Sequence, residues 1–164
     1  MILVDRDIKK RQSEIFCDGC YDEADVNPVS YDLHIMGIVE QDKLLDSYIV
    51  RPGEVVFVKM KEKIHIPKDL MGRIGEKNSR IRQGLWVSGP HYFPGHETYI
   101  YLRVQNITSG TIKIKKDDKI AQIFFEQLTE KPEYAYSEQQ NASYNEEDQY
   151  RGMAKYKDEY EERI

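Results

Sequence analysis

The strongest constraint on the fold is the alternation of residues 97–106, ETYIYLRVQN. Every second residue from Ile100 to Val104 is aliphatic, and the residues between them are aromatic or polar. Successive side chains of an extended strand point to opposite faces. The segment is therefore predicted to be a strand with one face in a hydrophobic core.

Short segments of the same kind recur along the chain at intervals of about 8 to 12 residues. They cover residues 27–40, 54–67, 70–74, 85–89, 111–116 and 119–128. The segment RPGE (51–54) predicts a turn, and Pro67 predicts a strand end because proline cannot donate to a ladder. The 164 residues suffice for one such domain. We expect a mainly β fold, a distorted barrel of jelly-roll type.

One short helix is expected near the N-terminus, ahead of the first strand. Ile8 and Ile15 are spaced to share one helix face, and Asp5 or Asp7 is expected to cap the helix start.

The last fifth of the chain differs in composition from the rest. Residues 132–164 contain nine of the 29 acidic residues, four of the 24 basic residues and six of the 12 tyrosines. The remaining chain is balanced, with 20 residues of each sign. Because this segment has too few aliphatic residues for a core of its own, we predict a barrel domain of residues 1–131 and an acidic, tyrosine-rich arm of residues 132–164.

Several functional classes are disfavoured by composition. No apolar run approaches the roughly 18 residues of a membrane span, and the N-terminus becomes charged after four residues, unlike a secretory signal. We expect a cytoplasmic protein with no membrane partner. The chain has no basic stripe, so no nucleic-acid partner is expected. Cys17 and Cys20 form a lone C-x-x-C pair, interpreted as two reduced cysteines in a loop; a zinc site completed by His34 or by another chain is the alternative.

A glycine-bounded segment, GEKNSRIRQG (75–84), interrupts the strands. Its cations are Lys77, Arg80 and Arg82, and Asn78 and Ser79 lie between them. We predict a short helical turn that ends in a glycine cap. Cations, hydroxyls and backbone N–H groups that converge in this way can bind an anion. The simpler interpretation of the segment is a solvated basic turn.

The order of motifs resembles that of the dCTP deaminases and trimeric dUTPases. The resemblance is carried in sequence order by MILVDRDIKK, NPVSYDLHI, RPGEVVFVKMKEKIHIPKDLMGRI, EKNSRIRQGL, NITSGTIKIKKDDKIAQIFF and YNEEDQYRG, which together run from residue 1 to about residue 153. It implies a dUTPase-like distorted β-barrel with a short N-terminal helix and a C-terminal arm.

The resemblance also implies a phosphate site in the 75–84 segment. The family motif G-R-S-S-x-x-R-x-G-L aligns with Lys77, Asn78, Ser79 and Arg82. Lysine in place of the first arginine keeps the charge but loses the bidentate fork. The family arm further implies nucleotide contacts from Tyr144 and Tyr150, whereas its lysine and final glutamine are replaced by Gln149 and Met153.

Two departures concern the family's catalytic carboxylates. Arg103 stands where deaminases carry a glutamate that shuttles protons, and arginine cannot act as a general base. Phe93 stands where dUTPases carry an aspartate that activates water, in a hairpin that also reads the pyrimidine. His91 and His96 flank that hairpin and are interpreted as bystanders, although one could act as a base.

The family's first and last barrel motifs are retained. The resemblance implies that Asp32 positions water around a Mg²⁺ ion that bridges the phosphates, and that Gln122 assists. Magnesium is therefore the expected cofactor, and Asp32 its indirect, water-mediated contact. The structural alternative for Asp32 is a turn cap.

Two functions follow from these matches and departures. The first is a divergent hydrolase or deaminase that acts on a dUTP- or dCTP-type nucleotide, with hydrolysis favoured because of Arg103. The second is an inactive homologue that binds a nucleotide or phosphate. Trp86, Tyr99 and Tyr101 would form an exposed apolar patch on a monomer, so we expect a homotrimer. The arm is expected over the anion site, chiefly that of a neighbouring subunit, as a lid or as an acidic plug.

Overall fold

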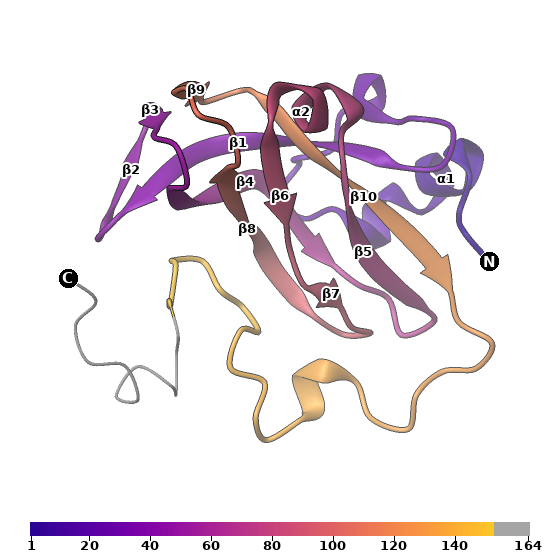
Figure 1. Ribbon diagram of the computed structural model, residues 1–164. Helices are drawn as coiled ribbons and strands as arrows, with labels where there is room; N and C mark the ends of the chain where they lie inside the picture. Colours follow the sequence, from indigo (N-terminus) through magenta and orange to yellow (C-terminus); the bar gives the residue numbers. More distant parts are fainter. Residues whose placement is uncertain (153–164) are drawn as a thin grey trace.

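The computed structural model describes residues 1–152, and its strands form one large curled sheet and one small sheet (Figure 1). In spatial order the large sheet contains β6 (Leu85–Ser88), β8 (Glu97–Asn106), β4 (Val55–His65), β1 (Tyr31–Glu40), β10 (Lys119–Gln127), β5 (Leu70–Glu76) and β7 (His91–Tyr92). Strand β2 (Lys43–Leu45) pairs with β1, and β3 (Ser47–Val50) pairs with β9 (Ile112–Lys115). All of these pairs are antiparallel. The expected mainly β, dUTPase-like barrel is confirmed.

The alternation of residues 97–106 decides which face of β8 enters the core. Ile100, Leu102 and Val104 are completely buried, and the residues between them lie on the outer face. The neighbouring strand β4 alternates in the same way and pairs with β8 from Val55 opposite Gln105 to His65 opposite Glu97, with a shift in register between Lys59 and Lys63. The outer faces of β4 and β8 therefore form one continuous surface of aromatic and charged residues.

Helix α1 (Asp5–Ile15) packs Ile8 and Ile15 into the core, as their spacing predicts. The predicted cap is wrong: Val4 occupies the N-cap position and no side chain caps the helix. Asp5 and Asp7 lie one step further on, in the first turn, where acidic side chains favour the helix dipole.

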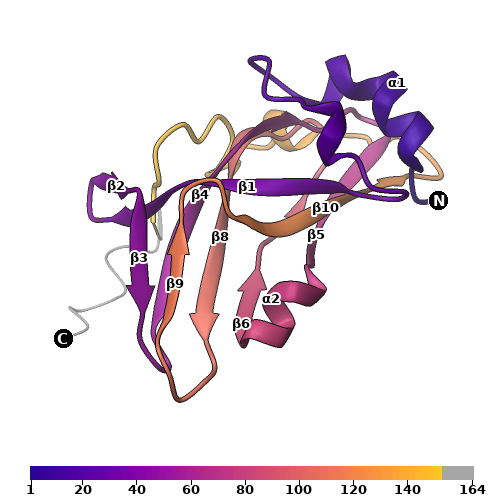
Figure 2. The ribbon, with the colours of Figure 1, turned by 90° about the horizontal axis from the view of Figure 1, so that it is seen from above.

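Helix α2 (Asn78–Gln83) is the predicted short helical turn, and it joins β5 to β6. It ends at Gly84, whose φ of 86° is left-handed and whose N–H bonds back to the carbonyl oxygens of Arg80 and Ile81. Glycine adopts this conformation at little cost, so the glycine cap is confirmed. Figure 2 shows α1 and α2 on either side of β1 and β10.

The described part of the arm lies on the barrel of its own chain. It contains the short 3₁₀ turn η2 (Tyr136–Glu138) and then follows the start of β8, where Glu146 N–H donates to the Glu97 carbonyl oxygen (2.6 Å) and Tyr136 N–H to that of Pro94 (2.7 Å). Figure 1 shows it passing β7, at the end of the sheet opposite α2. Within one chain, the arm up to residue 152 therefore does not cover the 75–84 segment. Residues 153–164 of the predicted arm, Met153 included, lie outside the described residues.

A second short turn, η1 (Glu23–Asp25), precedes β1. No helix within residues 1–152 is long and apolar enough to cross a membrane.

Candidate functional site

The residues predicted to form one site fall into two groups at opposite ends of the sheet. Lys77, Asn78, Ser79 and Arg82 belong to α2 or its first flanking residue, and Asp32 and Gln122 lie beside them on β1 and β10. Tyr144, Tyr150, Phe93 and Arg103 line a pocket at the other end. In Figure 1, α2 and the arm that carries Tyr144 and Tyr150 lie at opposite ends of the sheet.

The first group contains a buried carboxylate held by two lysines. Asp32 is 5% exposed; its Oδ1 accepts from Asn27 Nδ2 at 2.8 Å and pairs with Lys77 Nζ, and its Oδ2 lies 3.2 Å from Lys119 Nζ. Burial alone would raise the pKa of Asp32, but the hydrogen bonds from Lys77, Asn27 and Lys119 together lower it below the ordinary value. Asp32 is therefore a charged anchor for the start of α2.

The charged cluster extends deeper into the barrel. Lys119 also pairs with the buried Asp25 at 2.8 Å, and Asp25 lies 3.3 Å from His34 Nε2. His34 Nδ1 lies 3.0 Å from Glu62, which is 2% exposed. The hydrogen bond to Glu62 raises the pKa of His34. Alternating charges thus run from Lys77, at the start of α2, to the buried Glu62 on β4.

Gln122 holds the segment that leads from β5 into α2. Its Nε2 donates to the Glu76 carbonyl oxygen at 2.9 Å, and its Oε1 accepts from Ser30 Oγ at 2.6 Å. The amide thus holds the end of β5 immediately before Lys77.

The exposed residues of α2 are the ones free to meet a ligand. Asn78, Ser79 and Arg82 are all exposed, and Arg82 Nε donates to Asn78 Oδ1 at 3.2 Å. Arg80 is held by the barrel instead, through the Lys119 carbonyl oxygen and Asp118.

The surroundings of Asp32 do not fit a directly bound metal ion. Both of its oxygens face lysine ammonium groups, and within residues 1–152 no group of three His, Cys, Asp or Glu residues is placed to hold a metal. Cys17 and Cys20 are free cysteines, and burial raises the pKa of both thiols, that of Cys17 to about 11. The two cysteines fit the expected reduced pair.

The second group surrounds a pocket of about 830 Å³. Its lining comes from the segment 88–93, from the outer face of β8 and from the arm, and includes Tyr99, Tyr101, Arg103, Tyr136, Tyr144, Glu147 and Tyr150. The volume lies within the usual range for sites that bind small molecules. Aromatic walls with a few charged groups suit a ligand with a flat ring and polar edges.

Arg103 and Phe93 face this pocket from β8 and from the hairpin. The Arg103 guanidinium lies 5.0 Å from the centre of the Trp86 ring, a cation–π arrangement. Phe93 is about half exposed, and its ring lies 6.1 Å from that of Tyr136 in the arm. Both positions that differ from the family's carboxylates therefore line one pocket.

His96 is held by the arm. Its Nε2 donates to the Tyr144 carbonyl oxygen at 2.8 Å, and its ring lies 4.2 Å from that of Tyr136. Burial lowers the pKa of His96, so the imidazole is neutral near neutral pH. Its main contact ties the pocket wall to the arm.

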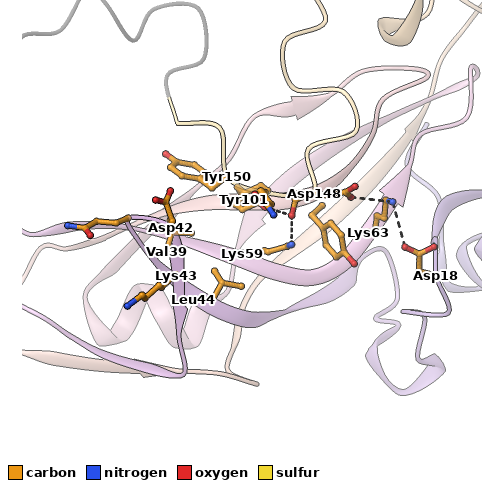
Figure 3. A pocket seen from close by; sticks show the side chains of 13 residues that line it. Asp18, Val39, Asp42, Lys43, Leu44, Lys59, Lys63, Tyr101, Asp148 and Tyr150 are labelled. Atoms are coloured by element: carbon orange, nitrogen blue, oxygen red, sulfur yellow. Dashed lines mark hydrogen bonds and ion pairs between the residues drawn. The ribbon is translucent and has the colours of Figure 1, made fainter.

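A neighbouring pocket of about 610 Å³ shares Tyr99, Tyr101 and Tyr150 with the first (Figure 3). Two of its lysines are already engaged by the arm: Lys59 Nζ donates to the Asp148 carbonyl oxygen at 2.5 Å, and Lys63 Nζ lies 3.4 Å from the Asp148 carboxylate. These contacts fix the arm next to the larger pocket.

The sequence did not single out three residues that shape the pocket. Tyr136 and Glu147 come from the arm, and Tyr101 was predicted only as part of an apolar patch. Glu147 lies in the acidic run EED (146–148), which gives no signal that distinguishes one carboxylate from the next.

Known proteins share this fold and motif order. The profile of the dCTP deaminase-like family matches residues 2–128, so the chain belongs to that family. A dUMP-forming dCTP deaminase from Parafrankia sp. is 29% identical, with 83% of this chain and 81% of the relative aligned. A dCTP deaminase from Pyrococcus horikoshii is 27% identical over 84% of this chain and 89% of the relative.

Solved structures agree on the fold. The crystal structure of a 2'-deoxycytidine 5'-triphosphate deaminase from Agrobacterium tumefaciens superposes with a TM-score of 0.64 at 18% identity, over 76% of this chain and 46% of that chain. A mutant dUTPase from phage phi11 of S. aureus, described with a structural Mg(II) ion, gives a TM-score of 0.52 at 15% identity, over 64% of this chain and 80% of that chain.

Proposed function

We propose that this protein is a hydrolytic enzyme that acts on deoxynucleoside triphosphates of the dUTP or dCTP type. The observation that carries the proposal is the 830 Å³ aromatic pocket, which lies where the family's reacting positions, Phe93 and Arg103, fall. The nucleoside would occupy this pocket, with its ring against the aromatic wall that includes Tyr144 and Tyr150.

The triphosphate would be held by α2 of a neighbouring copy. Lys77, Asn78, Ser79 and Arg82 precede β6, whereas Ser88 at the far end of β6 lines the pocket, so the two groups are separated by the length of this strand. A closed homotrimer would place α2 of one chain beside the pocket of the next. The exposed Trp86, on the outer face of β6, would also be buried in such an assembly.

The presence of Arg103 in the pocket favours attack of water at phosphorus over attack at the nucleobase. Arg103 cannot remove a proton from water, but its charge suits an anionic group that develops near the pocket. Magnesium would arrive with the triphosphate as part of the substrate, because Asp32 is already paired with lysines.

The test is direct turnover with a binding measurement beside it. Each common deoxynucleoside triphosphate is incubated with the protein and Mg²⁺, and the products are separated by ion-exchange chromatography. We expect release of pyrophosphate from a pyrimidine nucleotide. If no nucleotide is turned over above the buffer rate, the enzymatic function is refuted.

The phosphate site is tested by calorimetry on Arg82→Ala. Loss of one charge-assisted contact should weaken binding by about tenfold to a hundredfold. Lys113→Ala, on the exposed side of β9, removes the same charge away from α2 and should leave the affinity almost unchanged. Equal effects of the two variants would place the phosphates elsewhere.

An inactive nucleotide-binding homologue is the second candidate. It is favoured by one observation, the replacement of both family carboxylates by Arg103 and Phe93. Tight binding that Arg82→Ala weakens, together with no product from any nucleotide, would establish this function instead.

A further inference from the structure

The pocket contains a carboxylate that the family's motifs do not provide. Among the described residues that line it, Glu147 is the only aspartate or glutamate. It comes from the arm, whereas the family's deaminase glutamate belongs to the strand that here carries Arg103. The side chain is 6% exposed, so it is both buried and next to the cavity.

The arm holds Glu147 in a fixed position. Its Oε1 accepts the Arg151 N–H at 2.7 Å, and the Arg151 guanidinium donates to the carbonyl oxygens of Ser143, Asn145 and Glu146 at 2.8 to 3.0 Å. The loop is tied to the barrel in turn, because Asn145 Oδ1 accepts from Glu97 N–H at 3.1 Å. A carboxylate on a doubly anchored loop is preorganised.

We propose that Glu147 is the general base of this pocket and activates the water that attacks the bound nucleotide. The inference rests on the proposed function and adds the residue that performs its central step. In this protein the arm supplies the carboxylate that other family members carry on the barrel.

The electrostatic surroundings suit a base. Burial raises the pKa of Glu147, outweighing the opposing effects of the Arg151 N–H and of the Arg151 and Lys59 charges. A carboxylate with a raised pKa is a stronger base than an exposed one. The other titratable or charged groups that line the pocket are Tyr92, Tyr99, Tyr101, Tyr136, Tyr144, Tyr150, His91, His96 and Arg103.

The step balances with water as the only co-reactant. Glu147 takes one proton from water as the water oxygen forms a bond to the α-phosphorus. The bond from that phosphorus to the bridging oxygen breaks, and pyrophosphate leaves with the electron pair. The proton then passes from Glu147 to solvent. If the attack took place at C4 of a cytosine ring instead, ammonia would leave and carry the proton, so the products distinguish the two reactions.

The experiment compares Glu147→Gln with Glu146→Gln, which removes the adjacent, exposed carboxylate. Turnover, calorimetric affinity and thermal unfolding are measured for both and for the wild type. We expect Glu147→Gln to lower kcat by about a hundredfold or more, with affinity within threefold of wild type and the fold retained. Glu146→Gln should behave as wild type in all three.

A pH profile separates a base from a structural residue. The wild-type kcat/KM should rise with pH through a limb that lies above the ordinary glutamate pKa, and this limb should disappear in Glu147→Gln. Lys59→Gln removes a charge that lowers the pKa of Glu147, so it should move the limb to higher pH.

Each outcome bears on one proposal. Two results would overturn the role of Glu147 and leave the proposed function standing. The first is a kcat of Glu147→Gln within threefold of the wild-type value. The second is an acid limb of kcat/KM that stays at the same pH in both Glu147→Gln and Lys59→Gln. If the wild type turns over no nucleotide, both proposals fail together.

Discussion

Gly84→Ala is the substitution for which the structure makes the sharpest quantitative prediction. Gly84 ends α2 with a φ of 86°, and a Cβ added there would lie 2.0 Å from Thr108 Cγ2. Two costs therefore add. An L-residue in the left-handed region costs about 1 kcal/mol, and forcing a methyl group into an occupied position costs a further ~1 to 3 kcal/mol.

Thr108 cannot simply turn aside. Its Oγ1 donates to Asn106 Oδ1 at 2.8 Å, and its N–H donates to the same oxygen at 2.9 Å. Rotation of the side chain would break the Oγ1 bond, which contributes about 1 kcal/mol. We therefore expect Gly84→Ala to lower the free energy of unfolding by about 2 to 4 kcal/mol.

Two matched variants separate the costs. Gly53 also has a positive φ, 76°, but no atom lies within 4 Å of a Cβ added there, so Gly53→Ala should cost only about 1 kcal/mol. Thr108→Ser removes the clashing methyl and keeps the hydroxyl, so Gly84→Ala made in that background should also cost about 1 kcal/mol.

The assay is urea unfolding followed by far-ultraviolet circular dichroism, with thermal unfolding as a second measure. For a chain of this size, each kcal/mol corresponds to a shift in Tm of roughly 2 to 4 °C. If Gly84→Ala costs no more than Gly53→Ala, or if Thr108→Ser does not relieve it, the reasoning about this cap is wrong.

Three further predictions concern stability and the arm. The hydrogen bonds from Arg11 hold the pKa of Asp69 at about 2, below its usual 3.8, so Arg11→Met should lower the free energy of unfolding by up to about 2 kcal/mol above pH 4 and by progressively less between about pH 4 and 2, measured by urea unfolding across pH. The pKa of His34 is raised by Glu62, so its contribution is complete below about pH 6.5 and is lost as the pH rises through the folded-state pKa; His34→Asn should remove that slope from the same curves. Truncation after Thr129 should leave the barrel folded by circular dichroism but weaken nucleotide binding in calorimetry, because the arm provides part of the pocket wall; tighter binding would indicate an acidic plug.

The barrel and α2 could be predicted because local signals and the fold agree. Alternation alone selected the buried face of β8, and a glycine after a polar, cationic segment predicted the left-handed cap at Gly84. The short strands β2 and β3 and the two-residue strand β7 were not predicted, because so few residues carry too weak a pattern. The predicted cap of α1 was wrong for a related reason. Asp5 and Asp7 are both plausible cap residues, and the path of the chain at Val4 decides where the helix begins.

The partners of the site residues could not be predicted, because they are distant in sequence. Nothing near Lys77 indicates that it pairs with Asp32, 45 positions away. The expected placement of the arm over the anion site of a neighbouring subunit stays a prediction; within residues 1–152, Asp148 and Glu138 of the arm pair with Lys63 and Lys68 of its own barrel. Two of the three cations of α2 are already matched by Asp32 and Asp118 of the barrel.

If Glu147 is the general base, its placement on the arm would couple the position of the arm to chemistry. Glu146 and Glu147 are adjacent and chemically identical, yet one is exposed and the other is 6% exposed against the pocket. The difference arises only when residues 143–151 are held at the start of β8, where Asn145 Oδ1 and the Glu146 N–H bond to the Glu97 backbone and Arg151 braces the loop from within. A glutamate on the barrel would be present whether or not the arm had closed. A glutamate on the arm is present only when the arm is in place, so with Glu147 as the base, water would be activated only in a covered pocket. Arg103 would then be available to bind an anionic group, and this would account for an arginine at the position where the family carries a carboxylate.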